Sequence, residues 1–269
     1  MRSLRGKFMA LTIAAFVLVA CSTVPITGRT QLDLVPNSTM LATSFQEYDK
    51  FLEEHKLSTN QEETQMVKRV GTRIEKAVEQ YFKEKGLSHQ LDGYAWEFNL
   101  VQSDEANAWC MPGGKVVVYT GILPITRNEA GLATVMAHEI AHAVARHGNE
   151  RMSQALLAEM GGMALAVALD QHPSQTSQLW MAVYGVGTQV GILLPYSRLQ
   201  ETEADHLGLV FMAMAGYDPH QAVEFWQRMT KMKEGQAPPE LLSTHPSDES
   251  RIKKIKEFLP EAMEYYKKG

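Results

Sequence analysis

The sequence contains only two cysteines, Cys21 and Cys110, among 269 residues. Cys21 stands at the end of a segment that resembles an export signal and is expected to carry a lipid on its thiol. Cys110 is then the one thiol expected to be free inside the folded chain. An intramolecular disulfide framework is therefore excluded, although the segment indicates export. The fold must be stabilised by an apolar core, and the length suits one domain with a full core.

Positive charge is also scarce. The chain carries 26 Lys and Arg against 31 Asp and Glu, a formal net charge of −5 at pH 7. The cations form no basic stripe, and the sequence shows no repeats or low-complexity tracts. Proteins that bind nucleic acid gather cations on one face, so we expect no nucleic-acid partner.

Long apolar runs are missing as well. Two apolar segments, residues 156–169 and 179–194, are each shorter than the roughly 20 residues of a transmembrane helix, and the first contains Glu159. They favour a helical hairpin packed on the domain. A lid, or a surface that faces a membrane or a partner, is the alternative.

Residues 1–20 are predicted to be a signal peptide, because three cations precede the apolar run of residues 8–20. The run ends in Leu-Val-Ala-Cys, with Cys21 last, and this resembles the lipobox of bacterial lipoproteins. The resemblance implies cleavage before Cys21 and a lipid on its thiol that holds the chain to a membrane. Ser22 resembles the sorting pattern for the outer membrane, which implies a periplasm-facing position in the bacterial cell envelope. An ordinary signal peptide that contains a cysteine is the alternative.

The most distinctive pattern is His-Glu-Ile-Ala-His at residues 138–142, inside an alanine-rich stretch predicted to be one buried helix over residues 126–148. Positions four apart lie on one helix face, so His138 and His142 point at a common place, as the ligands of a divalent metal do. Glu139 is rotated by about 100° and can reach the same place without being a ligand, which suits a general base. The alternative is a chance meeting of two buried histidines, but their burial is costly unless something pairs them.

A second cluster of charged side chains opens a later helix, which Ser197 and Gln200 are predicted to cap. Glu201 and Asp205 share a face, and two like charges at this spacing repel unless they have different partners. If Glu201 binds the metal and Asp205 accepts a hydrogen bond from a ligand histidine, both charges are satisfied. Glu203 points nearly the opposite way, so we expect metal binding to be independent of it.

Strands are predicted ahead of the metal helix. Residues 94–101 alternate in polarity, and residues 107–120 read as a hairpin around Pro-Gly-Gly. The hairpin begins with Asn107, Ala108 and Trp109, which is similar to the edge strand of thermolysin-like enzymes. Such a strand would pair with the backbone of a peptide substrate. An ordinary hairpin is the alternative.

His245 lies in a polar, turn-forming loop before Pro246, far in sequence from both metal helices. If this loop folds over the cleft, His245 could donate to the oxyanion that forms on a scissile carbonyl. It could instead occupy the open position of the metal and keep the site latent. A surface histidine that starts the last helix is the third interpretation.

Taken together, H-E-x-x-H, S-R-x-x-E-x-E-A-D-x-x-G, A-G-Y-D-P and T-H-P resemble the HtpX and CaaX-prenyl-endopeptidase family of gluzincin-type zinc metallopeptidases. The resemblance covers nearly all of residues 25–260, including Pro-Ile-Thr-Gly-Arg at residues 25–29, and is greatest to the exported, lipid-anchored, BepA- and LoiP-like branch of outer-membrane quality-control proteases. It implies one Zn²⁺ per chain, with His138, His142 and Glu201 as its ligands. It also implies that Glu139 is the general base and that Asp205 either orients a ligand or donates a proton.

The expected fold is α+β, a mostly helical gluzincin metallopeptidase domain with a small antiparallel sheet or hairpin edge beside the metal helix. This domain would occupy residues 58–269, without C-terminal helical repeats, after a lipid-anchored tether and packing arm of residues 21–57. The resemblance implies a zinc-dependent endopeptidase that acts on misfolded or misassembled envelope proteins. The alternatives are a non-catalytic zinc-containing assembly factor or chaperone at the outer membrane, and a lipid-anchored binding module without a metal.

Overall fold

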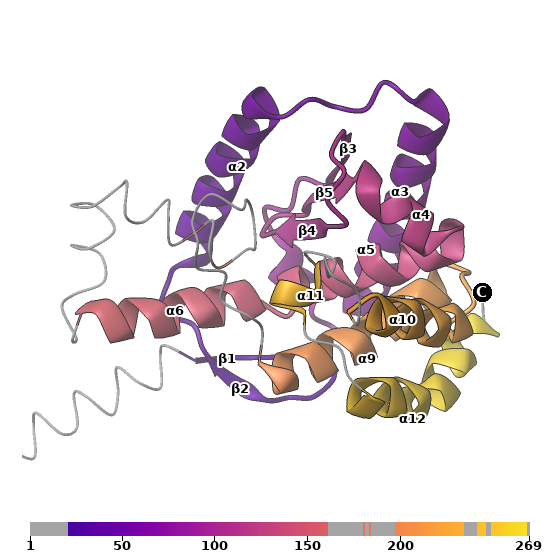
Figure 1. Cartoon of the computed structure of the whole chain (residues 1–269). Helices are drawn as coiled ribbons and strands as arrows, with labels where there is room; N and C mark the ends of the chain where they lie inside the picture. Colours follow the sequence, from indigo (N-terminus) through magenta and orange to yellow (C-terminus); the bar gives the residue numbers. More distant parts are fainter. Residues whose placement is uncertain are drawn as a thin grey trace, which may run out of the picture.

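The computed structural model describes residues 21–160, 180, 183, 197–233, 241–245 and 249–267. Residues 1–20, where the signal peptide is predicted, and residues 161–179 and 184–196, which hold most of the two predicted apolar segments, lie outside the described residues. The described elements of Figure 1 are, in chain order, β1 (Cys21–Thr23), β2 (Thr30–Leu32), α2 (Asn37–Glu54), α3 (Gln61–Glu84), η1 (Ser88–Leu91), β3 (Glu97–Val101), β4 (Ala108–Met111), β5 (Lys115–Tyr119), η2 (Thr120–Ile122), α4 (Leu123–Thr126), α5 (Glu129–Val144), α6 (His147–Met160), α9 (Arg198–Met214), α10 (His220–Lys233), α11 (Leu241–Thr244) and α12 (Glu249–Tyr266).

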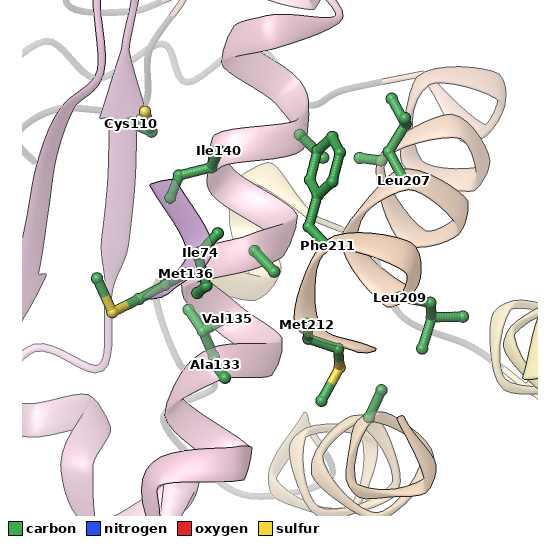
Figure 2. Close-up of a cluster of buried hydrophobic side chains, with 14 of the residues drawn as sticks. Ile74, Cys110, Ala133, Val135, Met136, Ile140, Leu207, Leu209, Phe211 and Met212 are labelled. Atoms are coloured by element: carbon green, nitrogen blue, oxygen red, sulfur yellow. The ribbon is translucent and has the colours of Figure 1, made fainter. Parts of the chain in front are cut away.

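Helix α5 is the centre of the fold, and nearly all of its side chains are buried. Strand β4 packs along one side and α9 along another, so that Cys110 and Phe211 lie on opposite sides of α5 (Figure 2). The crossing of α5 and α9 is tight at Gly208, where a Cβ atom would lie 3.2 Å from the Cα of His138. The missing side chain therefore lets the two helices that carry the predicted ligands pack in direct contact.

A three-stranded sheet with the order β3-β5-β4 makes β4 an edge strand. β4 and β5 form the predicted antiparallel hairpin, whereas β3 pairs with β5 in parallel. The sheet is mixed, not antiparallel throughout, because the chain crosses from β3 to the far edge before the hairpin returns between them. One face packs on α3 and α5, and the other packs on α2, where the ring of Trp109 meets Tyr48 and Phe51 edge-on.

The start of the central helix differs from the prediction. The cap is Asn128, whose side-chain oxygen accepts a hydrogen bond from the backbone N–H of Gly131 at 2.8 Å. Thr126 belongs to the preceding short helix α4. Arg127 separates the two helices because its backbone lies in the left-handed region, with φ of 68°.

The end of the central helix also comes earlier than the predicted stop at Gly148. Helix α5 ends at Val144, and Arg146 takes up the left-handed region with φ of 60°. The chain turns there and α6 begins at His147. This turn matters for the site, because it allows the side chain of His147 to fold back against α5.

The segment predicted as a tether and packing arm contains the antiparallel hairpin of β1 and β2, followed by α2. Gln31 of β2 donates a hydrogen bond to the carbonyl of Ala145, at the end of α5, at 2.7 Å. The backbone N–H of Leu34 donates to Ser153 Oγ of α6 at 3.0 Å. The hairpin therefore packs directly against the helices that carry the site.

The expected fold class is confirmed, since the described chain is mostly helical with two small sheets. Among the described residues, no helix combines the length and the apolar character that crossing a membrane requires. The domain boundaries at residues 20 and 57 stay predictions.

Candidate metal centre

His138 and His142 project from α5 toward one point, as their spacing predicts. Their Nε2 atoms lie 3.1 Å apart, and both side chains are buried. Burial lowers the pKa of His142 well below its usual value. The ring is therefore neutral at pH 7, which is the form that binds a metal ion.

Glu201 joins these histidines from α9. The predicted capping box of Ser197 and Gln200 is present and starts this helix one turn ahead of the carboxylate. Glu201 Oε1 lies 3.3 Å from His142 Nε2, and Oε2 lies 3.6 Å from His138 Nε2. Burial alone would raise the pKa of Glu201, but Arg251 and other nearby donors outweigh it and hold the pKa well below its usual value. The side chain is thus an ionised carboxylate, as a ligand must be.

His245 completes the cluster from the end of α11. It is buried, and its Nδ1 lies 3.2 Å from His138 Nε2 and 2.9 Å from Glu201 Oε1. His245 therefore lies at the centre, and its interpretation as a surface residue is wrong.

The four donor atoms fit a single zinc ion in spacing and in chemistry. Three ring nitrogens and one carboxylate oxygen, all buried, lie within 4.8 Å of one another. Tetrahedral ligands at 2.0–2.1 Å from zinc stand about 3.3 Å apart. Glu201 Oε1 lies 2.9 Å from His245 Nδ1 and 3.3 Å from His142 Nε2, and His138 Nε2 lies 3.1 and 3.2 Å from the other two ring nitrogens. Imidazole nitrogen with carboxylate oxygen is a donor set that zinc accepts.

Glu139 lies beside the four donors without being one of them. Its Oε1 is 3.4 Å from His245 Nε2 and accepts no hydrogen bond from the described residues. Burial raises the pKa of Glu139, and the nearby His245 and His138 offset this only in part. A carboxyl with a raised pKa and an unengaged oxygen is suited to accepting and passing on a proton.

Asp205 lies one turn beyond Glu201 on α9 and contacts a ligand ring from behind. Its Oδ1 lies 3.0 Å from His138 Nδ1. When Nδ1 carries the proton and donates it to this carboxylate, the Nε2 lone pair faces the other donors. The geometry is the one expected for a residue that orients a metal ligand.

Arg251 of α12 is a site residue that sequence reasoning missed. Its Nε and Nη2 donate to the two oxygens of Asp205 at 2.8 Å each, and its Nη1 lies 2.6 Å from Glu201 Oε2. The guanidinium also stacks over Trp226 at 3.4 Å. Burial would raise the pKa of Asp205, but the charge of Arg251 outweighs it and keeps the pKa below its usual value. In the sequence, Arg251 precedes the apolar stripe of an amphipathic helix, a position at which arginine ordinarily faces water.

The predicted substrate strand lies at an edge of the three-stranded sheet, but its side chains belong to the core. Ala108 and Trp109 are buried on opposite faces of β4. The Asn107 side-chain oxygen accepts from the backbone N–H of Ala108 at 2.9 Å. Any contact of this strand with a substrate must therefore use the backbone.

Comparison with known proteins identifies relatives of this arrangement. Over 202 residues, the chain is 36% identical to the mitochondrial metalloendopeptidase OMA1 of Saccharomyces cerevisiae, covering 72% of this chain and 56% of the relative. It is 43% identical over 170 residues to the mitochondrial metalloendopeptidase OMA1 of Schizosaccharomyces pombe, covering 62% and 48%. It is 31% identical over 162 residues to the beta-barrel assembly-enhancing protease of Escherichia coli, covering 58% and 33%. The chain spans about half the length of the two yeast relatives and a third of the bacterial one.

These relatives contradict the predicted location at a bacterial outer membrane. The two yeast relatives are mitochondrial by name. The prediction depended on a short apolar segment behind a few cations, on its lipobox-like end at Cys21, and on the single residue Ser22. Such features indicate a targeting segment, but they are too few to fix the membrane of destination.

A match to a known family covers the region that contains the candidate metal centre. The sequence pattern of peptidase family M48 matches residues 68–259, which is more than two thirds of the chain. The matched range includes the four donors, Glu139, Asp205 and Arg251. This chain therefore belongs to peptidase family M48.

Proposed function

We propose that this chain is a zinc-dependent endopeptidase. The observation that carries the proposal is the convergence of His138, His142 and Glu201 on one point, with the buried carboxyl of Glu139 beside it and outside the donor set. A metal held only for stability would have no use for an adjacent base of this kind.

The residues around the point have distinct tasks in peptide hydrolysis. Zinc, when bound, supplies a Lewis acid that polarises the scissile carbonyl and acidifies water. Glu139 accepts the proton of the attacking water and delivers it to the leaving nitrogen. Asp205 keeps His138 in the required tautomer, and Arg251 holds Asp205 and Glu201 in their ionised forms. Both oxygens of Asp205 are engaged by these partners, which favours the orienting role over proton donation.

A peptide substrate is proposed to bind along the free edge of β4. The Tyr119 N–H donates to the Asn107 carbonyl at 3.1 Å, which fixes the alternation of the β4–β5 ladder. By this alternation, the backbone groups of Ala108 and Cys110 point away from β5. The Ala108 N–H already donates to Asn107 Oδ1, so an extended peptide would pair with the Ala108 carbonyl and with the backbone of Cys110 as an added strand.

The physiological substrates are proposed to be misfolded or misassembled membrane or envelope proteins. The printed name of the Escherichia coli relative, a beta-barrel assembly-enhancing protease, supports a substrate of this class. The same relative supports the proposal that this chain is related to the BepA-like branch of the family. A lipid on Cys21 stays a prediction that depends on residues 1–20, which lie outside the described residues.

His245 is proposed to hold the enzyme in a latent state. Its Nδ1 takes the fourth corner of the donor set, the position that a catalytic site keeps open. A residue that donates a hydrogen bond to the oxyanion would instead lie farther from the metal, because the carbonyl group of the substrate would lie between them. The four-donor set is also the pattern of a structural site, so it keeps the non-catalytic assembly factor as the competing function.

Replacing His245 by Ala separates these functions. In the latent state, His245 occupies the fourth position of the metal. If this state makes up about 90% of the population, its removal raises basal cleavage about tenfold, and the zinc content stays unchanged. Casein cleavage and metal analysis on one preparation give both numbers. His220→Ala, which removes a half-exposed histidine at the start of α10, is the matched control and should change neither.

The other outcomes of this experiment are equally decisive. A fall in kcat of about 10²–10³ would assign His245 to the oxyanion. Loss of zinc without any gain in cleavage would favour the structural site and the non-catalytic function.

Metal removal tests the proposed function itself. We expect the full chain to cleave casein, to lose this activity on treatment with EDTA, and to regain it when Zn²⁺ is added at one equivalent per chain. Restoration is expected because α5 and α9, which carry His138, His142 and Glu201, are capped by their own side chains and not by the metal. Cleavage that survives complete metal removal would refute a metallopeptidase.

A further inference from the structure

A chain of hydrogen bonds leads outward from ligand His142 on the side opposite to Glu201. His147 is fully buried, and its Nδ1 lies 3.0 Å from His142 Nδ1. The left-handed turn at Arg146 produces this contact, because it ends α5 and starts α6 with the ring of His147 folded back on the previous helix. The non-ligating nitrogen of His142 is thus held by another imidazole, where Asp205 holds His138.

Glu203 fixes the direction of these hydrogen bonds. Its Oε2 lies 3.1 Å from His147 Nε2, and a carboxylate can only accept. His147 must therefore donate from Nε2, which leaves its Nδ1 as an acceptor when the ring is neutral. His142 then donates from Nδ1, and its Nε2 lone pair points at Glu201 and His138. One buried carboxylate sets the tautomers of two rings in series.

Arg29 holds this buried carboxylate in place. It comes from the turn between β1 and β2, and its Nε donates to Glu203 Oε1 at 3.0 Å while Nη2 donates to Oε2 at 3.0 Å. Its Nη1 and Nη2 also donate to the two oxygens of Glu150 on α6, at 2.8 and 2.9 Å. Thr27 adds a donor to Glu203 Oε1 at 2.8 Å. Two-pronged pairing of this kind fixes both carboxylates in position as well as neutralising them.

We propose that Arg29 is a positioning residue for the metal ligand His142, acting through Glu203 and His147. The β1–β2 hairpin is then a part of the metal centre and not only a connection to the N-terminal segment. The inference rests on the metal site of the proposed function and adds a group that lies outside the matched family region of residues 68–259.

Zinc affinity, measured on the full chain by competition with a chelator of known affinity, tests the proposal. Arg29→Ala should weaken Zn²⁺ binding about 10–100-fold, as removal of a partner behind a metal ligand does. Arg29→Lys keeps the positive charge but loses the paired N–H donors of the guanidinium. Its zinc affinity should therefore lie between those of Arg29→Ala and the wild type. His147→Ala should weaken binding, and adding Arg29→Ala to it should cause little further loss, because both residues act along one path.

Ser44→Ala is the matched control. Ser44 is a buried residue of α2, and its Oγ donates to the carbonyl of Pro112 at 2.6 Å. It ties the N-terminal segment to the β4–β5 hairpin without touching Glu203, His147 or the turn at Arg146, so this variant should bind zinc as tightly as the wild type. Equal weakening in Arg29→Ala and Ser44→Ala would show a general packing role and overturn the proposal. Wild-type affinity in Arg29→Ala would overturn it as well.

Misfolding of Arg29→Ala and failure of the wild-type chain to bind zinc are two further outcomes of this experiment. If circular dichroism shows that Arg29→Ala does not fold, Thr27→Val replaces it, since it removes one donor to Glu203 at nearly constant volume. Thr27→Val should then weaken zinc binding by a smaller factor, and wild-type affinity in that variant would refute the inference. A wild-type chain that binds no zinc would instead refute the proposed function.

Discussion

Replacing Glu139 by Gln should leave zinc bound and lower kcat for peptide cleavage about 10²–10⁴-fold, the usual contribution of a positioned general base. The amide has nearly the same volume as the carboxyl and stands outside the donor set, so the ligands His138, His142 and Glu201 keep their geometry. It cannot accept a proton from water, which removes the step assigned to Glu139. Casein hydrolysis and metal analysis on the same preparation measure both quantities.

The control for this variant is Glu129→Gln. Glu129 is at the other end of the same helix, where it pairs with Arg69 at the surface and does not touch the centre. This variant should cleave at the wild-type rate. Equal cleavage by Glu139→Gln and the wild type would remove Glu139 from the reaction, and zinc loss in Glu139→Gln would mean that it is a ligand.

Replacing Glu201 by Ala should remove zinc and, with it, all cleavage above the level of the EDTA-treated enzyme. The substitution deletes the only carboxylate oxygen of the donor set and leaves Arg251 with an unbalanced charge beside two histidines. We expect a loss of affinity greater than the roughly 10–100-fold that follows removal of a partner behind a ligand. Chelator competition measures the affinity, and Thr202→Ala is the control, because Thr202 is a partly exposed neighbour on α9 whose hydroxyl donates to the Arg198 carbonyl.

The same titration tests the difference between Glu201 and Glu203. In the proposed site Glu201 is a ligand, whereas Glu203 contacts His147, which in turn contacts the proposed ligand His142. Glu203→Gln should therefore weaken zinc binding measurably but less than Glu201→Ala. Comparable losses in the two variants would contradict the ligand assignment.

The core of the site could be predicted because its spacing is local. Two histidines four apart on a helix must share a face, and so must Glu201 and Asp205. Helix capping by Ser197 and Gln200, and the hairpin around Pro-Gly-Gly, are equally short-range features, and the structure contains both.

The rest of the site depends on packing between distant segments. Arg251 reaches the centre only because α12 folds against α9 and α10, and His245 follows α11, whose Leu241 N–H donates to the carbonyl of Ala106 ahead of β4. No local pattern marks either residue as buried. The expectation that metal binding is independent of Glu203 used the geometry of α9 alone. It left out the turn at Arg146, which brings His147 between Glu203 and the ligand His142.

Backbone conformation explains the misplaced ends of α5. Thr126 and Gly148 are the residue types that usually start and end helices. Here Arg127 and Arg146 adopt the left-handed region that glycine usually fills, and the surrounding contacts compensate for the cost. Propensity alone could not have placed the helix ends at these arginines.

Anomalous diffraction at the zinc absorption edge, from crystals of the wild-type chain, tests whether zinc binds among the residues of the candidate metal centre. We expect one strong peak per chain, roughly 2.0–2.1 Å from the Nε2 atoms of His138 and His142 and from a carboxylate oxygen of Glu201. No peak at this position in zinc-supplemented crystals, or one that lacks Glu201 among its ligands, would contradict this expectation.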